Sequence, residues 1–262
     1  MSFTQLQFKT PAAALNVHSL ATSNMITAET VQNIKALQEH APLTARFSTK
    51  GKELDLVDRY LEKWLSQSND HTQLTIFVEP KLQSGYPDVV AVYWDPSVAG
   101  RWPRARGELT PMDIRMAHHA YLSRKVDLKA LKALAPGRKM DAALNRLLDA
   151  DIFVQGKTTL LQRPMSDIFA VRRLVAIEAK LCAAQRGLDQ AFQNTWFASE
   201  SYLLIPALPK NPEFLDAARR LGVGILEETT PIEKSAVRAR RDRIPKSYPS
   251  WLFNEWAWRS TL

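Results

Sequence analysis

Two opposite charges stand close together in a stretch of the sequence that is otherwise apolar. Residues 174–181 read LVAIEAKL, a composition typical of a buried β-strand. Because side chains on a strand alternate between its two faces, Glu178 and Lys180 are expected to point to one side, and Ile177 and Ala179 to the other. A carboxylate and an amine two residues apart on one strand pair poorly. The pattern Glu-x-Lys therefore indicates a site for a hard metal ion and an activated water molecule.

A second carboxylate, Asp88, opens another apolar run, which continues to Trp94. By itself it is equally typical of a turn before a strand. Two carboxylates that face one point repel each other unless a cation lies between them. Mg²⁺ prefers oxygen ligands and keeps several of its waters, so Asp88 and Glu178 would be enough protein carboxylates to hold it. We therefore expect Mg²⁺ as the cofactor, with Mn²⁺ as the alternative.

The elements that position these residues form an α/β pattern. A helix is predicted over residues 49–66 from its apolar stripe, and Glu53 lies in its first turn, one residue ahead of that stripe. Strands are predicted at 74–80 and 86–94. From residue 171 onward the order is strand, helix, strand, helix, strand, and the first of these helices carries Gln190. This order implies right-handed crossovers and a mixed, partly parallel sheet flanked by helices.

The sequence between residues 97 and 167 predicts a different order of elements, mainly helices. A linker rich in proline, glycine and arginine, residues 95–107, leads into helices predicted at 111–121, 127–134 and 139–149 and a hairpin around 152–161. Three helices and a hairpin resemble a winged helix-turn-helix domain, which often reads the DNA major groove but also serves as a protein–protein module. The candidate DNA contacts are basic or amide side chains: Arg104, Arg106, Arg138, Lys139, Asn145, Arg146 and Lys157.

The order Pro87-Asp88 followed by Glu178-Ala179-Lys180 resembles the PD-(D/E)xK, or restriction-endonuclease-like, nuclease superfamily. The resemblance covers residues 45–96 and 168–228, interrupted by the insert. It implies that Asp88, Glu178 and the carbonyl of Ala179 bind the metal and that Lys180 holds the attacking water. Glu53 matches an acidic residue on the first helix of many members, and Gln190 a glutamine found in a subset.

These parts divide the chain into five segments: an accessory arm, residues 1–44; two core segments, 45–96 and 168–229; the insert, 97–167; and a basic and aromatic C-terminal segment, 230–262. The last segment is interpreted either as aromatic side chains packed on the core or as a phosphate clamp with aromatic side chains for stacking on bases. An arm helix is predicted at 27–38.

Composition limits the classes of function. The 262 residues carry a formal net charge of +8, which favours a polyanionic partner. The single cysteine, Cys182, excludes an intramolecular disulfide and a cysteine-rich zinc site. The N-terminus does not read as a signal peptide and no apolar run reaches membrane-spanning length, so we expect a cytoplasmic protein without membrane contact.

The resulting hypothesis is a metal-dependent DNA endonuclease, and the resemblance implies a role in defence, restriction or mobile-element processing. A non-catalytic DNA-binding or assembly protein on a nuclease-like core is the alternative, and an RNA-cleaving or RNA-binding protein is a third. A homodimer or a larger protein assembly would suit cuts in both strands.

Overall fold

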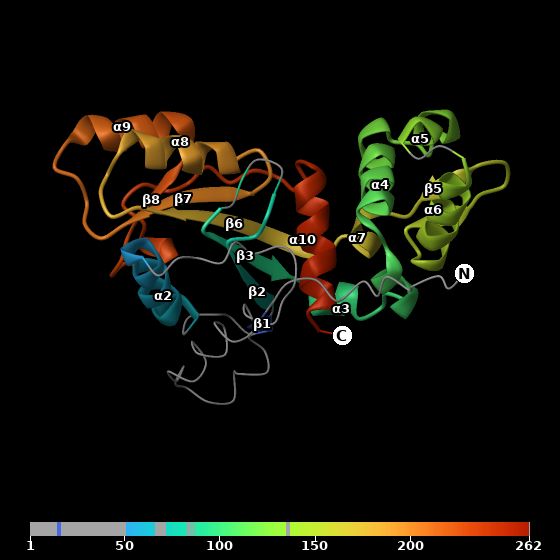
Figure 1. The fold of residues 1–262 in the computed structure, drawn as a ribbon, viewed down its shortest axis with the longest axis horizontal. Helices are drawn as coiled ribbons and strands as arrows, with labels where there is room; N and C mark the ends of the chain where they lie inside the picture. The colour runs from blue at the N-terminus through green and yellow to red at the C-terminus, as the bar shows by residue number, and fades with distance from the viewer. Residues whose placement is uncertain are drawn as a thin grey trace, which may run out of the picture.

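The computed structural model describes residues 15–16, 51–65, 72–82, 85, 87–134 and 137–261. Apart from the two-residue strand β1 (Leu15–Asn16), the accessory arm with its predicted helix at 27–38 lies outside the described residues. The remaining chain forms an elongated α/β molecule in which a central sheet lies at one end and the insert at the other (Figure 1).

The sheet is mixed, as the sequence predicted. Its strand order is β1-β2-β3-β6-β7-β8. Strands β2, β3 and β6 pair antiparallel, whereas β7 and β8 run parallel to β6. The strand bounds are β2 Gln73–Val78, β3 Val89–Trp94, β6 Val171–Ala179, β7 Glu200–Ile205 and β8 Gly224–Glu227.

Helices cover both faces of this sheet. Helix α2 (Lys52–Leu65) buries Leu56 and Val57 against one face, which includes Ile177 and Ala179. Helices α8 (Gln185–Asn194) and α9 (Pro212–Leu221) pack on the other face. The alternation predicted for β6 is confirmed, because Leu174 and Ala176 belong to the core of the opposite face. No helix in the described ranges is long and apolar enough to cross a membrane.

The insert contains the predicted three helices and hairpin, but the residues leading into it are not an open linker. Asp95 caps a short helix that begins at Pro96, and its side chain accepts a hydrogen bond from the Ser97 backbone N–H. The Trp102 indole donates to the Asp167 carbonyl over 2.6 Å. The element bounds are α3 Pro96–Ala99, η2 Arg104–Glu108, α4 Pro111–Ser123, α5 Leu128–Leu134, α6 Arg138–Asp149, β4 Phe153–Gln155, β5 Leu160–Gln162 and α7 Met165–Ile168.

The C-terminal helix α10 (Tyr248–Arg259) fastens the insert to the sheet. Its Trp251 and Phe253 side chains are fully buried in a core that extends from the sheet face into the insert. The rings of Phe253 and Phe77 lie 5.4 Å apart, and those of Trp258 and Trp102 lie 5.7 Å apart. Buried rings cannot stack on bases, so the core-packing interpretation of these aromatic side chains is correct and the stacking interpretation is wrong.

Candidate active site

The start of β3 and the end of β6 bring the two predicted carboxylates together. The antiparallel register pairs Val89 with Ile177, which places Asp88 beside Glu178 at the edge of the sheet. The Ala179 backbone N–H donates to Asp88 Oδ2 over 2.7 Å, so the chain itself fixes the orientation of this carboxylate. The Glu178 side chain is 4 % exposed and that of Asp88 is 23 % exposed.

The Lys180 ammonium lies where the predicted metal ligands converge. Its Nζ is 2.9 Å from Glu178 Oε1 and 2.8 Å from the Ala179 carbonyl oxygen. It lies 3.8 Å from Asp88 Oδ2 and 3.9 Å from Glu53 Oε2. The expectation that Glu178 and Lys180 pair poorly is wrong, because the Lys180 ammonium donates directly to Glu178 Oε1 although the Lys180 backbone N–H still bonds Leu204 of β7.

Helix α2 positions Glu53 at the rim of this cluster. Glu53 is three residues before Leu56 and four before Val57, so it continues the stripe that α2 packs on the sheet. Its side chain is 49 % exposed, which makes it the most solvated of the three carboxylates around Lys180. The structure thus brings together Glu53, Asp88, Glu178, Ala179 and Lys180, five of the residues that the sequence singled out.

Burial and mutual repulsion disfavour the charged forms of the two inner carboxylates. Burial, followed by the charge of Asp88, raises the pKa of Glu178 to about 7 although Lys180 opposes the shift. Burial likewise raises the pKa of Asp88, against the hydrogen bond from Ala179 and the charge of Lys180. Burial lowers the pKa of Lys180, but the neighbouring carboxylates outweigh this and raise it overall. The positive charge of a bound metal ion would act in the opposite direction and lower the pKa of Lys180.

The donor atoms suit a hard divalent cation. Two carboxylates and a backbone carbonyl supply oxygen ligands, the type that Mg²⁺ and Mn²⁺ prefer. These oxygens already surround a positive charge, the Lys180 ammonium, which stands in for a cation among them. Among the described residues no group of three histidine, cysteine, aspartate or glutamate side chains forms a metal site alone. The candidate centre therefore depends on the Ala179 carbonyl and on retained waters.

Helix α8 adds a residue that the sequence analysis missed. A Cβ atom on Gly187 would lie 2.7 Å from Lys180 Cγ and 3.1 Å from Leu203 Cδ1, closer than packed carbon atoms tolerate. The glycine therefore allows the helix to pass directly over the lysine stem. Gln190 lies one turn later on α8, and its buried Oε1 has no hydrogen-bond partner within the described ranges. A glycine inside a predicted helix next to the Glu-x-Lys motif was the available signal.

The predicted DNA contacts do not form one surface. Arg106 is fully buried: its guanidinium donates to Glu255 over 2.8 Å and 2.7 Å and lies 3.5 Å from the centre of the Trp102 ring. Its assignment to DNA is wrong, because the side chain joins η2 to α10 in the core. Arg146 is bound through two hydrogen bonds to the buried Asp113.

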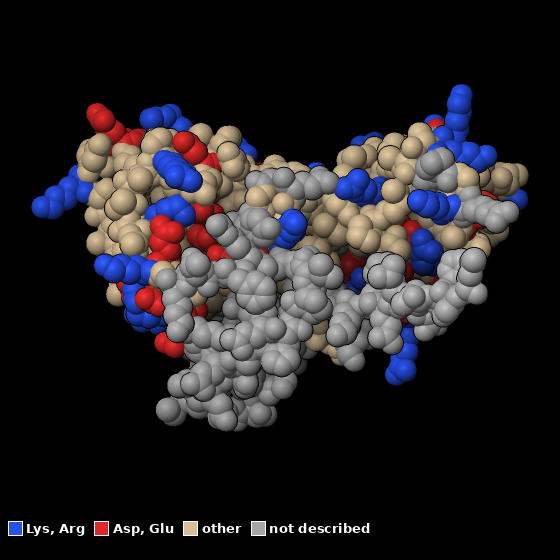
Figure 2. All heavy atoms as spheres, viewed as in Figure 1, with Lys and Arg blue, Asp and Glu red and all other residues tan. Residues whose placement is uncertain are grey.

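The other predicted contacts stay on the surface of the insert. Arg104, Lys139, Asn145 and Lys157 are exposed, whereas the side chain of Arg138 lies outside the described residues. Figure 2 shows basic side chains at both ends of the molecule and a dip in the outline between them. Strand β6 starts at Val171 beside the insert and ends at Ala179 beside Lys180. At ~3.3 Å per residue, these ends are about 26 Å apart.

Comparisons with known proteins gave no match: no protein-family model, no curated protein and no solved structure resembles this chain.

Proposed function

We propose that this protein is a metal-dependent endonuclease that hydrolyses phosphodiester bonds in DNA. The observation that carries the proposal is that Asp88, Glu178 and the Ala179 carbonyl all face the Lys180 ammonium, where the start of β3 meets the end of β6. Buried carboxylates with raised pKa values are costly unless a cation or a catalytic task accounts for them. This arrangement supports the nuclease-like core that the motif order suggests.

Each residue of the cluster has a separate task in this proposal. A bound Mg²⁺ or Mn²⁺ would neutralise the phosphate and lower the pKa of a bound water. Asp88, Glu178 and the Ala179 carbonyl would hold the ion, and the Ala179 N–H keeps Asp88 in place. Lys180, released from the carboxylates, would orient the attacking water and stabilise negative charge on the phosphate. Glu53, at the solvent rim, would complete the water shell.

The insert would hold the duplex at a distance from the reaction. We assign it a winged-helix role in which the exposed Arg104, Lys139 and Lys157 contact phosphates. The contacts lie in the insert beyond the start of β6, so the strand length of about 26 Å corresponds to a minimum separation of about eight base pairs at ~3.4 Å each. The buried Arg106–Glu255 pair fastens the insert through α10, so this separation is expected to stay fixed.

The proposal is tested by incubating supercoiled plasmid with the purified protein in Mg²⁺, Mn²⁺ or EDTA. We expect metal-dependent nicking or linearisation that is lost in Lys180→Ala, because the side chain at the centre of the cluster is removed. The matched control is Lys63→Ala, which removes an exposed lysine from the far end of α2 and should cleave normally. Undiminished cleavage by folded Lys180→Ala would refute the assignment.

One observation favours the non-catalytic alternative. The Lys180 ammonium already pairs with Glu178 over 2.9 Å, and this pair could serve a structural role in a DNA-binding protein. Thermal unfolding with and without 10 mM Mg²⁺ or Mn²⁺ separates the two functions, because only a metal site raises the melting temperature in a manner that Glu178→Gln abolishes. Competition between duplex DNA and RNA of equal length tests the choice of nucleic acid.

A further inference from the structure

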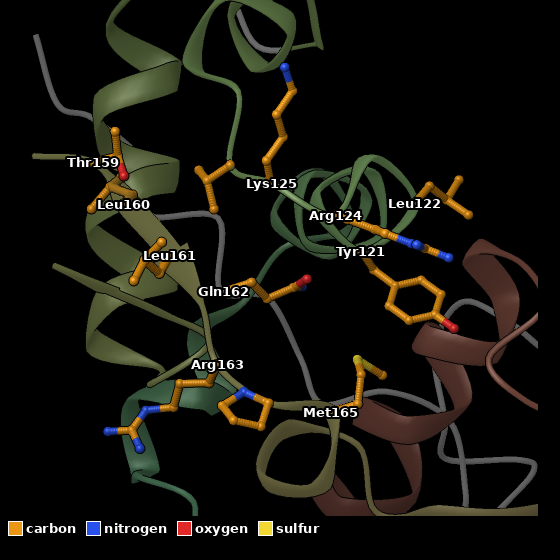
Figure 3. A pocket seen from close by; sticks show the side chains of 12 residues that line it. Tyr121, Leu122, Arg124, Lys125, Thr159, Leu160, Leu161, Gln162, Arg163 and Met165 are labelled. Carbon is orange, nitrogen blue, oxygen red and sulfur yellow. The ribbon is translucent and has the colours of Figure 1, made fainter. Parts of the chain in front are cut away.

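A groove in the insert has no part in the proposed catalysis. It lies between the end of α4 with the turn that follows and strand β5 with the segment leading into α7, and its volume is about 870 Å³ (Figure 3). A groove of this size accommodates several side chains of a peptide. The lining residues are Tyr121, Leu122, Arg124, Lys125, Val126, Thr159, Leu160, Leu161, Gln162, Arg163, Pro164 and Met165.

Both walls of the groove carry leucine side chains that are exposed to solvent. Leu122 is 61 % exposed and Leu161 is 52 % exposed, and they come from opposite walls. In Figure 3, Leu160 and Leu161 line one side of the groove, Tyr121 lies on the other, and Met165 lies below them in this view. Single exposed leucines are ordinary, but apolar side chains gathered around one hollow mark an interaction site.

The charged side chains that line the groove are all basic. The lining includes Arg124, Lys125 and Arg163 and no aspartate or glutamate. Lys125 pairs with the half-buried Asp127 over 3.3 Å, and Arg163 pairs with the exposed Asp151 over 3.1 Å. Such surface pairs contribute only about 0–1 kcal/mol, so a ligand carboxylate can replace them. The Arg124 side chain makes no ion pair within the described part of the chain.

We propose that this groove binds an acidic amphipathic segment of a partner protein. Leucine- or phenylalanine-like side chains of the segment would cover Leu122, Leu161 and Met165, and its carboxylates would meet the arginine and lysine side chains at the rim. Nucleic acid suits the groove poorly, because phosphates gain nothing from apolar walls. This inference is independent of the nuclease proposal, since none of the lining residues belongs to the catalytic cluster.

A displayed library of random 12-residue peptides tests the proposal against the full chain. Binders are counter-selected against the double variant Leu161→Glu/Arg124→Glu. The first substitution replaces an exposed apolar side chain of the groove by a charged one, and the second replaces an exposed positive charge by a negative one. We expect enriched peptides that combine apolar with acidic residues and that bind the wild type at least about tenfold more tightly than the double variant. Raising the salt concentration should weaken this binding.

The matched control is Leu208→Glu, which adds the same charge at an exposed leucine outside the groove and should bind like the wild type. Circular dichroism and thermal unfolding establish that all variants fold. The absence of peptides that discriminate wild type from the double variant, or enrichment of neutral or basic ones, would overturn the proposal. It would also be overturned if the double variant lost duplex DNA binding or self-association instead, since the groove would then serve nucleic acid or a second copy.

Discussion

The raised pKa of the buried Glu178 carboxyl makes the stability of the metal-free protein depend on pH. Burial and Asp88 raise the pKa of this carboxyl to about 7, from an ordinary value of 4.5. A carboxyl with a raised folded-state pKa binds a proton more readily in the folded than in the unfolded protein. The stability that the folded protein gains from protonated Glu178 is therefore fully present below pH 4.5. It is lost as the pH rises through 7.

Glu178→Gln should remove this penalty, because an amide has nearly the shape of the protonated carboxyl and no charge to desolvate. A difference of about 2.5 pKa units corresponds to about 3 kcal/mol. In EDTA we expect the variant to exceed the wild type in free energy of unfolding by about 3 kcal/mol at pH 8 and by under about 1 kcal/mol at pH 5, where folded Glu178 is already protonated.

Urea unfolding monitored by tryptophan fluorescence at the two pH values measures both differences. Asp95→Asn is the matched control. The hydrogen bond from Ser97 and the charge of Arg172 lower the pKa of Asp95 to about 2, so its stabilising charge is present at both pH 5 and pH 8. Its replacement should reduce stability equally at both pH values, in contrast to the pH-dependent gain at Glu178.

A loss of stability in Glu178→Gln at pH 8 would refute this reasoning. It would mean that the 2.9 Å contact with Lys180 outweighs the desolvation of the carboxylate and that the cluster is a structural ion pair. If the reasoning holds, adding Mg²⁺ at pH 8 should stabilise the wild type and leave Glu178→Gln unchanged.

Three further predictions follow from the packing around the site and the insert. Gly187→Ala should lower cleavage at least about tenfold, because the added methyl group displaces Lys180. The free energy of unfolding in urea should change by no more than about 1 kcal/mol, since alanine favours the helix. Unchanged cleavage would contradict the close approach of α8 to Lys180. Arg106→Met leaves Glu255 buried without its partner and should destabilise the protein by about 3–5 kcal/mol in urea unfolding, whereas Arg104→Met, at an exposed neighbour, should be nearly neutral. A hydroxyl-radical footprint of the Lys180→Ala complex should place the phosphates protected by the insert at one fixed distance of at least about eight base pairs from the wild-type cut. Protection that varies in distance would refute a fixed insert.

Local patterns in the sequence predicted the elements, whereas the cluster was expected from the resemblance of the motif order to a nuclease superfamily. The apolar stripe of α2, the β-branched runs of β2 and β3, and the alternation along β6 are short-range signals that persist in the structure. The strand-helix-strand order after residue 171 gave the parallel part of the sheet. The alternation along β6 placed Glu178 and Lys180 on one side. Asp88 was expected beside them only because the motif order resembles that of the nuclease superfamily, and the pairing of β3 with β6 that brings them together is visible only in the structure.

Tertiary structure alone decided which charges are available to a ligand. Arg106 and Arg104 look alike in the sequence, yet Arg106 is buried against Glu255, a residue 149 positions away, and Arg104 is exposed. The Gly187 contact with Lys180 likewise depends on how α8 crosses the sheet. A local pattern reports the periodicity of one element but not its partner across the core. The distance between insert and catalytic cluster, and the burial of the α10 aromatic side chains, are set by that long-range packing.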